Sequence, residues 1–254
     1  MFGILRAIRR RKYRRLEFPS QWYAILEEKV PFYQAYSDEQ RERFCTLVKI
    51  FVWEKHFIGA QGMEITDEVK VVIAASACRL ILNLGIKYYN RLTEIVVYPY
   101  VYTHPDQEGV IYGEAHAWGT VVLSWPAVMH GIQNPYDGEA TGAHEFAHVL
   151  DRADGVFDGT PLLRTGAAYG PWVRVMSRHF LALQKRNKKQ RKVLRMYGAT
   201  NEAEFFAVAT ESYFEKPEKM KRLTPELYQV MLRFYGPDLG SSSQDNPDSD
   251  QEEG

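Results

Sequence analysis

Three residues near the middle of the chain have the types and spacing of a metal-dependent hydrolase. The stretch 142–151 reads GAHEFAHVLD and contains His144, Glu145 and His148. In a helix, His144 and His148 lie one turn apart on the same face, where both imidazoles can bind one ion. Zinc held by neutral imidazoles lowers the pKa of bound water towards about 7, and the adjacent carboxylate of Glu145 can accept its proton. The stretch therefore predicts a zinc site that carries out hydrolysis.

The same stretch carries the apolar residues that a buried helix needs. Phe146, Ala147, Val149 and Leu150 fill the positions between the polar residues. This pattern is typical of a buried helix whose polar groups have been recruited for a purpose. We therefore expect the motif to lie against the core.

Two histidines do not complete the site, because catalytic zinc takes three protein ligands. A second stretch, 197–214, reads YGATNEAEFFAVATESYF and offers two carboxylates. Asn201 can cap a helix in which Glu204 and Glu211, seven residues apart, share a face. A buried carboxylate is costly unless it binds a cation or makes charge-assisted hydrogen bonds. The spacing alone leaves Glu204 and Glu211 as alternative third ligands.

Helices and strands must position these residues. Ser37 and Gln40 form a capping-box pattern that predicts a helix start, and Thr66 can cap a second helix. Residues 94–98 and 120–125 are rich in β-branched and aromatic side chains, which predicts two strands. The second strand leads towards the zinc helix. An edge strand beside the metal can pair with an extended peptide substrate.

Two further features have simpler explanations than chemistry. His116 lies just before the second strand and can touch substrate, but a lone histidine there is more often a packing or surface residue. After a loop rich in Gly and Pro, a helix that begins near Pro171 runs into 185–192, where six of eight residues are basic. That run can contact nucleic acid or an acidic partner. Because no interleaved aromatic side chains offer a stacking surface, we interpret it as a solvated helix end.

The overall composition is that of a globular protein. The 254 residues are 45% hydrophobic and 25% charged with a formal net charge of zero, so nothing draws the whole chain towards nucleic acid or anionic lipid. Cys45 and Cys78 lie in apolar helical patterns, where free thiols are expected and a disulfide is not. The sequence has neither an apolar run of about 18 residues nor a secretory signal pattern. We therefore expect a cytoplasmic protein without a transmembrane segment.

The two ends differ from the rest of the chain in charge. Residues 1–16 carry seven Lys or Arg and no acid, whereas 240–254 carry five acids and no base. The basic segment can act as an interfacial membrane helix, although a solvated extension is the simpler interpretation. The acidic segment cannot bury enough apolar surface to order itself. We predict a basic N-terminal extension at 1–16, one zinc-dependent domain at 17–239 and a disordered acidic tail at 240–254.

Three stretches together resemble a known family. LSW at 123–125, HEFAHVLD at 144–151 and the EFFAV core of 197–214 are similar to the Mlc titration factor A (MtfA) family of zinc-dependent peptidases. The similarity covers roughly residues 20 to 238, and the zinc site is also similar to that of the anthrax lethal factor protease domain. With the predicted elements, this resemblance implies an α+β fold. We expect a mainly helical, zincin-like metallopeptidase domain with a small sheet whose edge strand flanks the zinc helix.

The resemblance also implies a role for each site residue. The Glu that opens EFFAV, Glu204, joins His144 and His148 as the third ligand of one zinc ion per chain. Tyr197 assists catalysis, and Glu145 is the general base that takes a proton from the attacking water. The implied substrate is a peptide or protein, cleaved by an aminopeptidase or an endopeptidase reaction that the sequence does not distinguish.

Other interpretations stay open at this level. Glu211 remains the alternative third ligand, or an acceptor for a zinc-bound histidine. Because the family is named for titrating Mlc, a transcriptional repressor of glucose-uptake genes, sequestering a Mlc-like repressor is the alternative function. A purely structural zinc site is disfavoured, since no fourth Cys or His ligand is evident. No direct nucleic-acid partner is expected.

Overall fold

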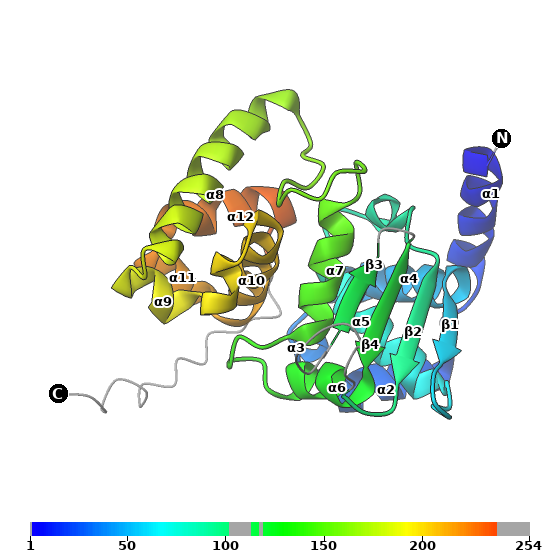
Figure 1. Ribbon diagram of the computed structural model, residues 1–254. Coiled ribbons are helices and arrows are strands. Elements are labelled where there is room, and N and C mark those ends of the chain that lie inside the picture. The colour runs from blue at the N-terminus through cyan, green and yellow to red at the C-terminus, as the bar shows by residue number, and fades with distance from the viewer. Residues whose placement is uncertain (1, 102–112, 117–118, 238–254) are drawn as a thin grey trace.

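The molecule consists of a part built around a small sheet and a second part made of helices, with one helix between the two parts. The computed structural model describes residues 2–101, 113–116 and 119–237. The sheet lies on one side and the helices of the C-terminal part lie on the other, while α7 (Thr141–Asp151) stands between them (Figure 1). The predicted acidic tail at 240–254 lies outside the described residues. The mainly helical α+β fold predicted from the sequence is confirmed.

The sheet has four strands among the described residues. Their order is β1 (His56–Gly59), β2 (Glu94–Tyr98), β4 (Thr120–Ser124) and β3 (Gly113–His116). The first three are parallel, and β3 pairs antiparallel with β4 at the edge of the sheet. Both predicted strands are present. The second ends at Ser124, because Trp125 begins helix α6 (Trp125–Gln133).

Strands β1 and β3 are not predicted by the sequence patterns. β1 has four residues, three of them exposed, so it shows no alternation of apolar and polar side chains. β3 ends at His116, which is in register with Thr120 of β4, so this histidine lies in a strand and not merely near one. β3 contacts α7, and β4 is an inner strand. The edge strand expected beside the helix of His144 and His148 is therefore β3.

Helices of the N-terminal part lie behind the sheet (Figure 1). They are α2 (Ser20–Lys29), α3 (Pro31–Gln34), α4 (Asp38–Glu54) and α5 (Asp67–Ile81), followed by the short 3-10 helix η1 (Ile86–Tyr89). The predicted capping box is present, since Ser37 accepts from the Gln40 backbone and the Gln40 side chain accepts from the Ser37 backbone. Thr66 caps α5 by accepting from the Val69 backbone. Both helix starts follow from local hydrogen bonding.

From residue 166 onward, the described C-terminal part consists of helices joined by short turns. Its elements are η2 (Gly166–Ala168), α8 (Tyr169–Gln184), α9 (Lys188–Val193), η3 (Met196–Ala199), α10 (Glu202–Glu215), α11 (Pro217–Leu223) and α12 (Pro225–Tyr235). The basic run at 185–192 differs from the predicted single helix end. Arg186 adopts φ 54, which breaks the helix, and the Asn187 side chain then caps α9. The run therefore spans a turn and a second short helix.

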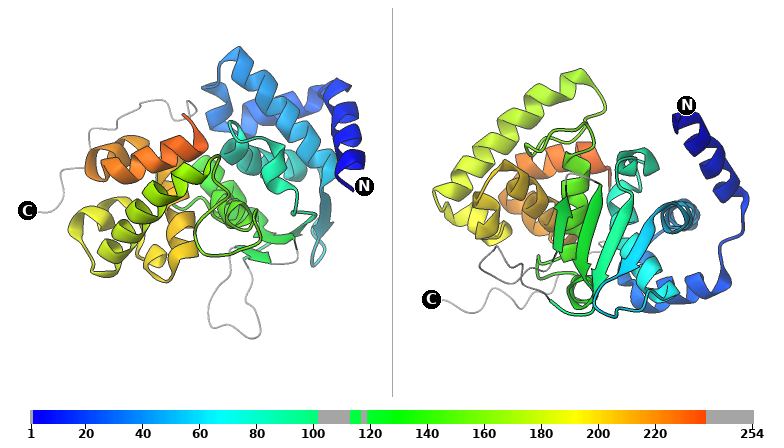
Figure 2. Two further views of the ribbon diagram at one scale, coloured as in Figure 1. Left: turned by 90° about the horizontal axis from the view of Figure 1, so that it is seen from above. Right: turned by 45° about the vertical axis from the view of Figure 1, so that its right-hand side comes forward.

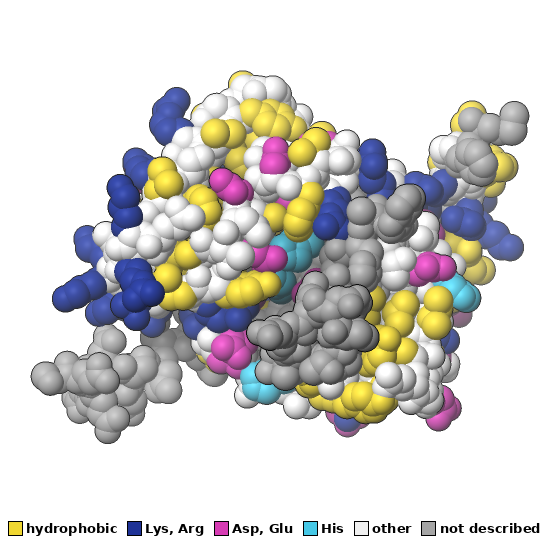
Figure 3. Space-filling model, in the orientation of Figure 1, with side chains coloured by type: hydrophobic (Ala, Val, Ile, Leu, Met, Phe, Trp, Pro, Cys, Tyr) yellow, Lys and Arg dark blue, Asp and Glu magenta, His cyan; other side chains and the backbone are white. Residues whose placement is uncertain are grey.

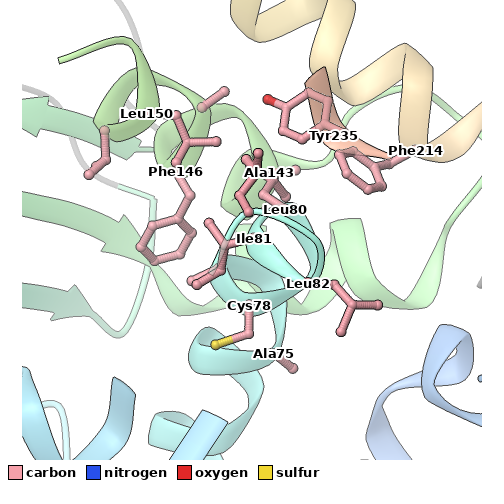
Figure 4. Packing of buried hydrophobic residues seen from close by; sticks show 14 of the residues in the cluster. Ala75, Cys78, Leu80, Ile81, Leu82, Ala143, Phe146, Leu150, Phe214 and Tyr235 are labelled. Atoms are coloured by element: carbon pink, nitrogen blue, oxygen red, sulfur yellow. The ribbon is translucent and has the colours of Figure 1, made fainter. Parts of the chain in front are cut away.

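Helix α7 is packed into the centre of the core. Its Phe146 ring lies 5.8 Å from the rings of both Phe51 and Tyr89. Figure 4 shows Phe146 and further side chains of α7 among the buried side chains of α5 and the C-terminal helices. Gly142 allows close approach to α5, because a Cβ at this position would lie 2.9 Å from Ser76 Oγ. These contacts fix α7 on both sides and so fix its polar residues.

The N-terminal helix α1 (Phe2–Arg15) stands at the edge of the molecule (Figures 1 and 2). Arg10 donates two hydrogen bonds to the Glu54 carboxylate of α4, at 2.6 and 2.7 Å. The predicted N-terminal extension is therefore a helix that is attached to the folded body. None of the helices in the described ranges is long and apolar enough to cross a membrane.

Candidate metal centre

Helix α7 separates core-facing residues from polar ones. Apolar residues of α7 recur at three- and four-residue spacing and are buried in the core. They are Ala143, Phe146, Ala147 and Leu150. The opposite side carries His144, Glu145 and His148, which are only 7%, 6% and 4% exposed. Such burial is unusual for polar side chains and requires partners from another element.

Helix α10 supplies those partners. Its start is set by Asn201, whose side chain accepts from the Glu204 backbone at 2.9 Å. Phe205 and Phe206 are 1% and 0% exposed and hold the helix in the core. The cap and these two rings direct Glu204 towards α7. The expected helix, its cap and its buried aromatic pair are all present.

Two imidazole nitrogens and one carboxylate oxygen meet between α7 and α10. His144 Nε2 lies 3.0 Å from Glu204 Oε2 and 3.2 Å from His148 Nε2. His148 Nε2 lies 3.4 Å from the same Glu204 oxygen. The His144 and His148 rings are nearly perpendicular, with centroids 4.8 Å apart. The arrangement is a possible three-residue metal site, and it unites three residues predicted from the sequence.

Glu211 contacts the other nitrogen of the same histidine. Its Oε1 lies 2.5 Å from His144 Nδ1, so it faces away from the meeting point of the three ligand atoms. The Glu211 side chain is fully buried, and Arg195 Nη2 donates to both of its oxygens at 2.7 Å. These contacts match the second alternative raised by the sequence, an acceptor for a histidine, and not the ligand position.

The charges of the site are strongly coupled. Burial disfavours the charged form of His144, but its hydrogen bonds to Glu204 and Glu211 outweigh this and raise its pKa to about 10. Burial also opposes ionisation of Glu204, but hydrogen bonds with His144 and His148 lower the pKa of that carboxyl well below its usual range. Burial lowers the pKa of His148. These opposite shifts favour a positive charge beside the Glu204 carboxylate, which is the charge that a bound metal ion would supply.

Glu145 and Tyr197 border the three candidate ligands. The Tyr197 ring lies 5.8 Å from the His144 ring, and its side chain is about half exposed. Burial, followed by the charges of Glu204 and Glu145, raises the pKa of Tyr197 to about 12. Its hydroxyl is therefore protonated at neutral pH and able to donate a hydrogen bond. Both residues predicted to act in catalysis thus lie at the site.

Sequence patterns missed three residues around the site. Arg195 pairs with Glu211, as described above. Phe157 packs its ring 5.3 Å from the His148 ring, and the Arg152 guanidinium lies 4.0 Å from the centroid of Phe157. The sequence offers one indication of a role for Phe157, which is an aromatic residue in the loop that follows the HExxH stretch. No spacing rule connects Arg195 to a glutamate sixteen residues later.

Only a small part of the site reaches the surface, because His144, Glu145 and His148 are nearly buried. Figure 3 shows histidine and acidic side chains side by side in the middle of one face, between the two halves of the molecule. The basic run at 185–192 lies elsewhere, around the start of α9 at the far end of the C-terminal helices (Figure 1). His116 is placed by its backbone in β3, next to α7. The predicted metal and catalytic residues are thus brought together without the basic run.

Comparison with known proteins agrees with this geometry. The family model described as glucose-regulated metallo-peptidase M90 matches residues 5–236. An uncharacterized protein of Synechocystis sp. is 37% identical over 232 residues, covering 85% of this chain and 84% of its own. Mlc titration factor A of Edwardsiella ictaluri is 30% identical, covering 82% of this chain and 85% of its own. The protein of the same name from Cronobacter sakazakii is 28% identical, with 87% of each chain covered.

Proposed function

The chain belongs to the glucose-regulated metallopeptidase family M90, and from that premise we propose that it is a zinc-dependent peptidase. One observation carries the proposal. The imidazoles of His144 and His148 meet the Glu204 carboxylate at the face of α7 that also holds Glu145. We assign His144, His148 and Glu204 as the ligands of one zinc ion. Glu145 is the proposed general base, and Tyr197 is the proposed hydrogen-bond donor.

The spacing of the three ligand atoms fits a zinc ion. Tetrahedral zinc, with ligands at about 2.0–2.1 Å, keeps neighbouring ligand atoms about 3.3–3.4 Å apart. The three separations of 3.0, 3.2 and 3.4 Å lie close to this value. Imidazole nitrogens and a carboxylate oxygen are also the usual donors of a catalytic site, which leaves one position open. The donor set therefore supports zinc as the metal.

Glu145 moves the proton in the proposed reaction. Zinc at this position would polarise the peptide carbonyl and lower the pKa of a water molecule. Glu145 follows His144 on the same buried helix, and its charge acts on both His144 and Tyr197. It accepts a proton from the attacking water and gives it to the amine nitrogen as the carbon–nitrogen bond breaks. One carboxylate thus serves as base and then as acid.

Tyr197 stabilises the oxygen that gains charge. Its raised pKa keeps the hydroxyl protonated, and its ring lies beside His144 at the open side of the site. A hydrogen bond from this hydroxyl to the former carbonyl oxygen is strongest when that oxygen is negative. The contribution therefore falls mainly in the transition state.

Glu211 and Arg195 position a ligand. Glu211 accepts from His144 Nδ1–H, which leaves Nε2 to bind the metal and holds the ring in one orientation. Arg195 donates to both oxygens of Glu211, which compensates the fully buried carboxylate for the loss of water. The two residues act through His144 and do not touch substrate.

The proposed substrate is a peptide or protein, and we propose that the reaction takes place in the cytoplasm. The family description contains the words "glucose-regulated", and several relatives are named Mlc titration factor A. We infer from these names a second candidate function, binding and sequestering a Mlc-like repressor. An intact ligand set with Glu145 beside it favours retained catalysis, because sequestration does not need a general base.

Metal analysis combined with peptide hydrolysis tests the function. Glu145→Gln keeps the shape of the side chain and removes the base. Zinc content should stay at one ion per chain, while turnover of a peptide panel should fall by at least about a hundredfold. Glu139→Gln, a change of the same chemistry at an acid outside the metal-centre residues, is the matched control. Unchanged turnover in the zinc-loaded Glu145→Gln protein would exclude Glu145 as the general base. No turnover in the zinc-loaded wild type would leave repressor binding as the remaining candidate.

A further inference from the structure

Helix α1 has two faces with different surroundings. Arg6, Arg10 and Tyr13, at i, i+4 and i+7, are the residues within 3–15 that are buried or partly buried. Tyr13 packs its ring 5.4 Å from that of Trp53, next to the Arg10 ion pair with α4. This stripe attaches the helix to the body. The attachment also fixes which side of the helix points away from the protein.

The opposite face presents aliphatic side chains to solvent. Ile4 and Ile8 lie one turn apart and are 70% and 61% exposed, and Leu5 beside them is also 61% exposed. They are more exposed than any other large hydrophobic residue whose side chain the structure describes. Figure 3 shows hydrophobic and basic side chains gathered on this projecting helix at the upper right. Holding three aliphatic side chains in water is unfavourable unless another surface covers them.

The same outward line continues into basic residues. Arg11 and Arg15 follow Ile4 and Ile8 at i+7 and i+11 from Ile4, with Lys12 alongside, and all three are exposed. Residues 1–16 contain seven bases and no acid. Of these bases, only Arg10 has an acidic partner among the ion pairs of the described residues. The exposed face thus pairs an aliphatic end with a cationic end.

We propose that α1 docks the protein on an anionic phospholipid bilayer. The side chains of Ile4, Leu5 and Ile8 enter the boundary between headgroups and acyl chains, and Arg11, Lys12 and Arg15 contact lipid phosphates and carboxylates. The helix lies at the opposite end of the molecule from α8 and α9 (Figure 1). Docking through α1 is separate from the metal centre and holds whether or not the chain hydrolyses peptides.

Charge and composition favour a bilayer over other occupants. A nucleic acid would neutralise the bases but would leave the three aliphatic side chains uncovered, and the aromatic Tyr13 is occupied by Trp53. A second copy would bring two unneutralised basic helices together, which is repulsive. An anionic bilayer covers the aliphatic end of the face and neutralises its cationic end. Since three aliphatic side chains alone give weak insertion, binding depends on anionic lipid and on low salt.

Vesicle cosedimentation of the full-length protein tests the proposal. We expect binding to phosphatidylserine-rich vesicles, little binding to pure phosphatidylcholine vesicles, and release at high salt. Replacing Ile4, Leu5 and Ile8 together by Ser should weaken binding at least about tenfold. Replacing Arg11, Lys12 and Arg15 together by Gln should weaken it roughly a hundredfold, at about fivefold per base. Arg10 and Tyr13 are kept in both variants, so α1 stays attached.

A matched control uses exposed aliphatic residues elsewhere. Val173 and Leu181 of α8 are 49% and 51% exposed, and their replacement by Ser should leave vesicle binding unchanged. Circular dichroism and melting curves confirm that each variant is folded. Equal binding of wild type and the aliphatic triple variant, equal binding to both vesicle types, or no vesicle binding would each overturn the proposal. Self-association that the triple variant abolishes, without vesicle binding, would assign the face to a second copy and overturn it too.

Discussion

Helix α10 carries Glu204 in its first turn and Glu211 about two turns later, and both carboxylates contact His144. Glu204 reaches Nε2, the nitrogen that also faces His148, and its side chain is 15% exposed. Glu211 reaches Nδ1, is fully buried, and accepts two hydrogen bonds from Arg195. A shared helix face therefore does not give two carboxylates the same chemistry. The neighbours at each turn leave Glu204 available to a metal ion and commit Glu211 to the histidine behind it.

Removing each carboxylate in turn tests most strongly whether Glu204 and Glu211 have different roles. Glu204→Ala should abolish stoichiometric zinc binding, because a three-ligand site is left with two histidines. Glu211→Ala should retain zinc but weaken its affinity about 10- to 100-fold, the usual effect of losing a group that orients a ligand. Zinc titration by calorimetry measures both. Glu202→Ala, which changes an exposed residue of the same first turn, serves as the control.

The reverse result would exchange the two roles. If Glu204→Ala bound one zinc ion normally and Glu211→Ala bound none, Glu211 would be the third ligand. The choice between them cannot be made from the sequence for a physical reason. Spacing places both on one helix face, whereas the deciding contact comes from Arg195 on the preceding segment. A contact between separate elements leaves no periodic trace in the sequence.

Tyr197 tests whether the open side near Glu204 is the reacting side. Tyr197→Phe should lower kcat by about ten- to a thousandfold, as for other donors to a developing negative charge. Zinc content and KM should change little, because the ring and its contact with His144 are kept. Since the pKa of Tyr197 is about 12, its ionisation should not limit the rate at neutral pH. A Phe variant with unchanged kcat would place the oxyanion donor elsewhere.

Glu215, at the end of α10, is another buried carboxylate and can be compared with Glu204 and Glu211. Burial, followed by the charge of Glu211, raises its pKa from 4.5 to about 8. The folded protein therefore holds this proton more tightly than the unfolded chain does. Stability from the neutral carboxyl is complete below about pH 4.5 and is lost as the pH rises through about 8.

Glu215→Gln should remove this pH dependence. Between pH 5 and pH 8 the variant should lose less stability than the wild type, by an amount on the order of a few kcal/mol at about 1.4 kcal/mol per pKa unit. Melting temperatures of both zinc-loaded proteins across this range measure the difference. Parallel curves for the two proteins would show that Glu215 is ionised and paired in the folded state.

Removing the acidic tail should have the smallest effect of these changes. Residues 240–254 contain no large apolar side chain, so we predict that they cannot bury enough apolar surface to order themselves. Truncation before Ser241 should leave melting temperature and peptide turnover nearly unchanged. A large loss of either would mean that the tail docks on the domain, and the proposed boundary at 239 would move.

The sequence predicts local structure well and pairing between distant segments poorly. The helix starts at Ser37, Thr66 and Asn201 follow from side chains that bond to backbone groups within three residues. The His144 and His148 pair follows from one turn of one helix. By contrast, β1 pairs with a strand 38 residues away, His56 opposite Glu94, and has no alternating pattern to reveal it. Local rules therefore identify the candidate ligands, and only the fold shows which side chains surround each of them.

An anomalous diffraction map at the zinc edge, from crystals of the zinc-loaded protein, tests the central claim most directly. We predict one peak per chain between α7 and α10, about 2.0–2.2 Å from His144 Nε2, His148 Nε2 and a Glu204 oxygen. The Glu211 carboxylate should remain on His144 Nδ1, outside bonding distance of the peak. A peak bound to Glu211 in place of Glu204, or no peak at this position in zinc-loaded crystals, would contradict the account.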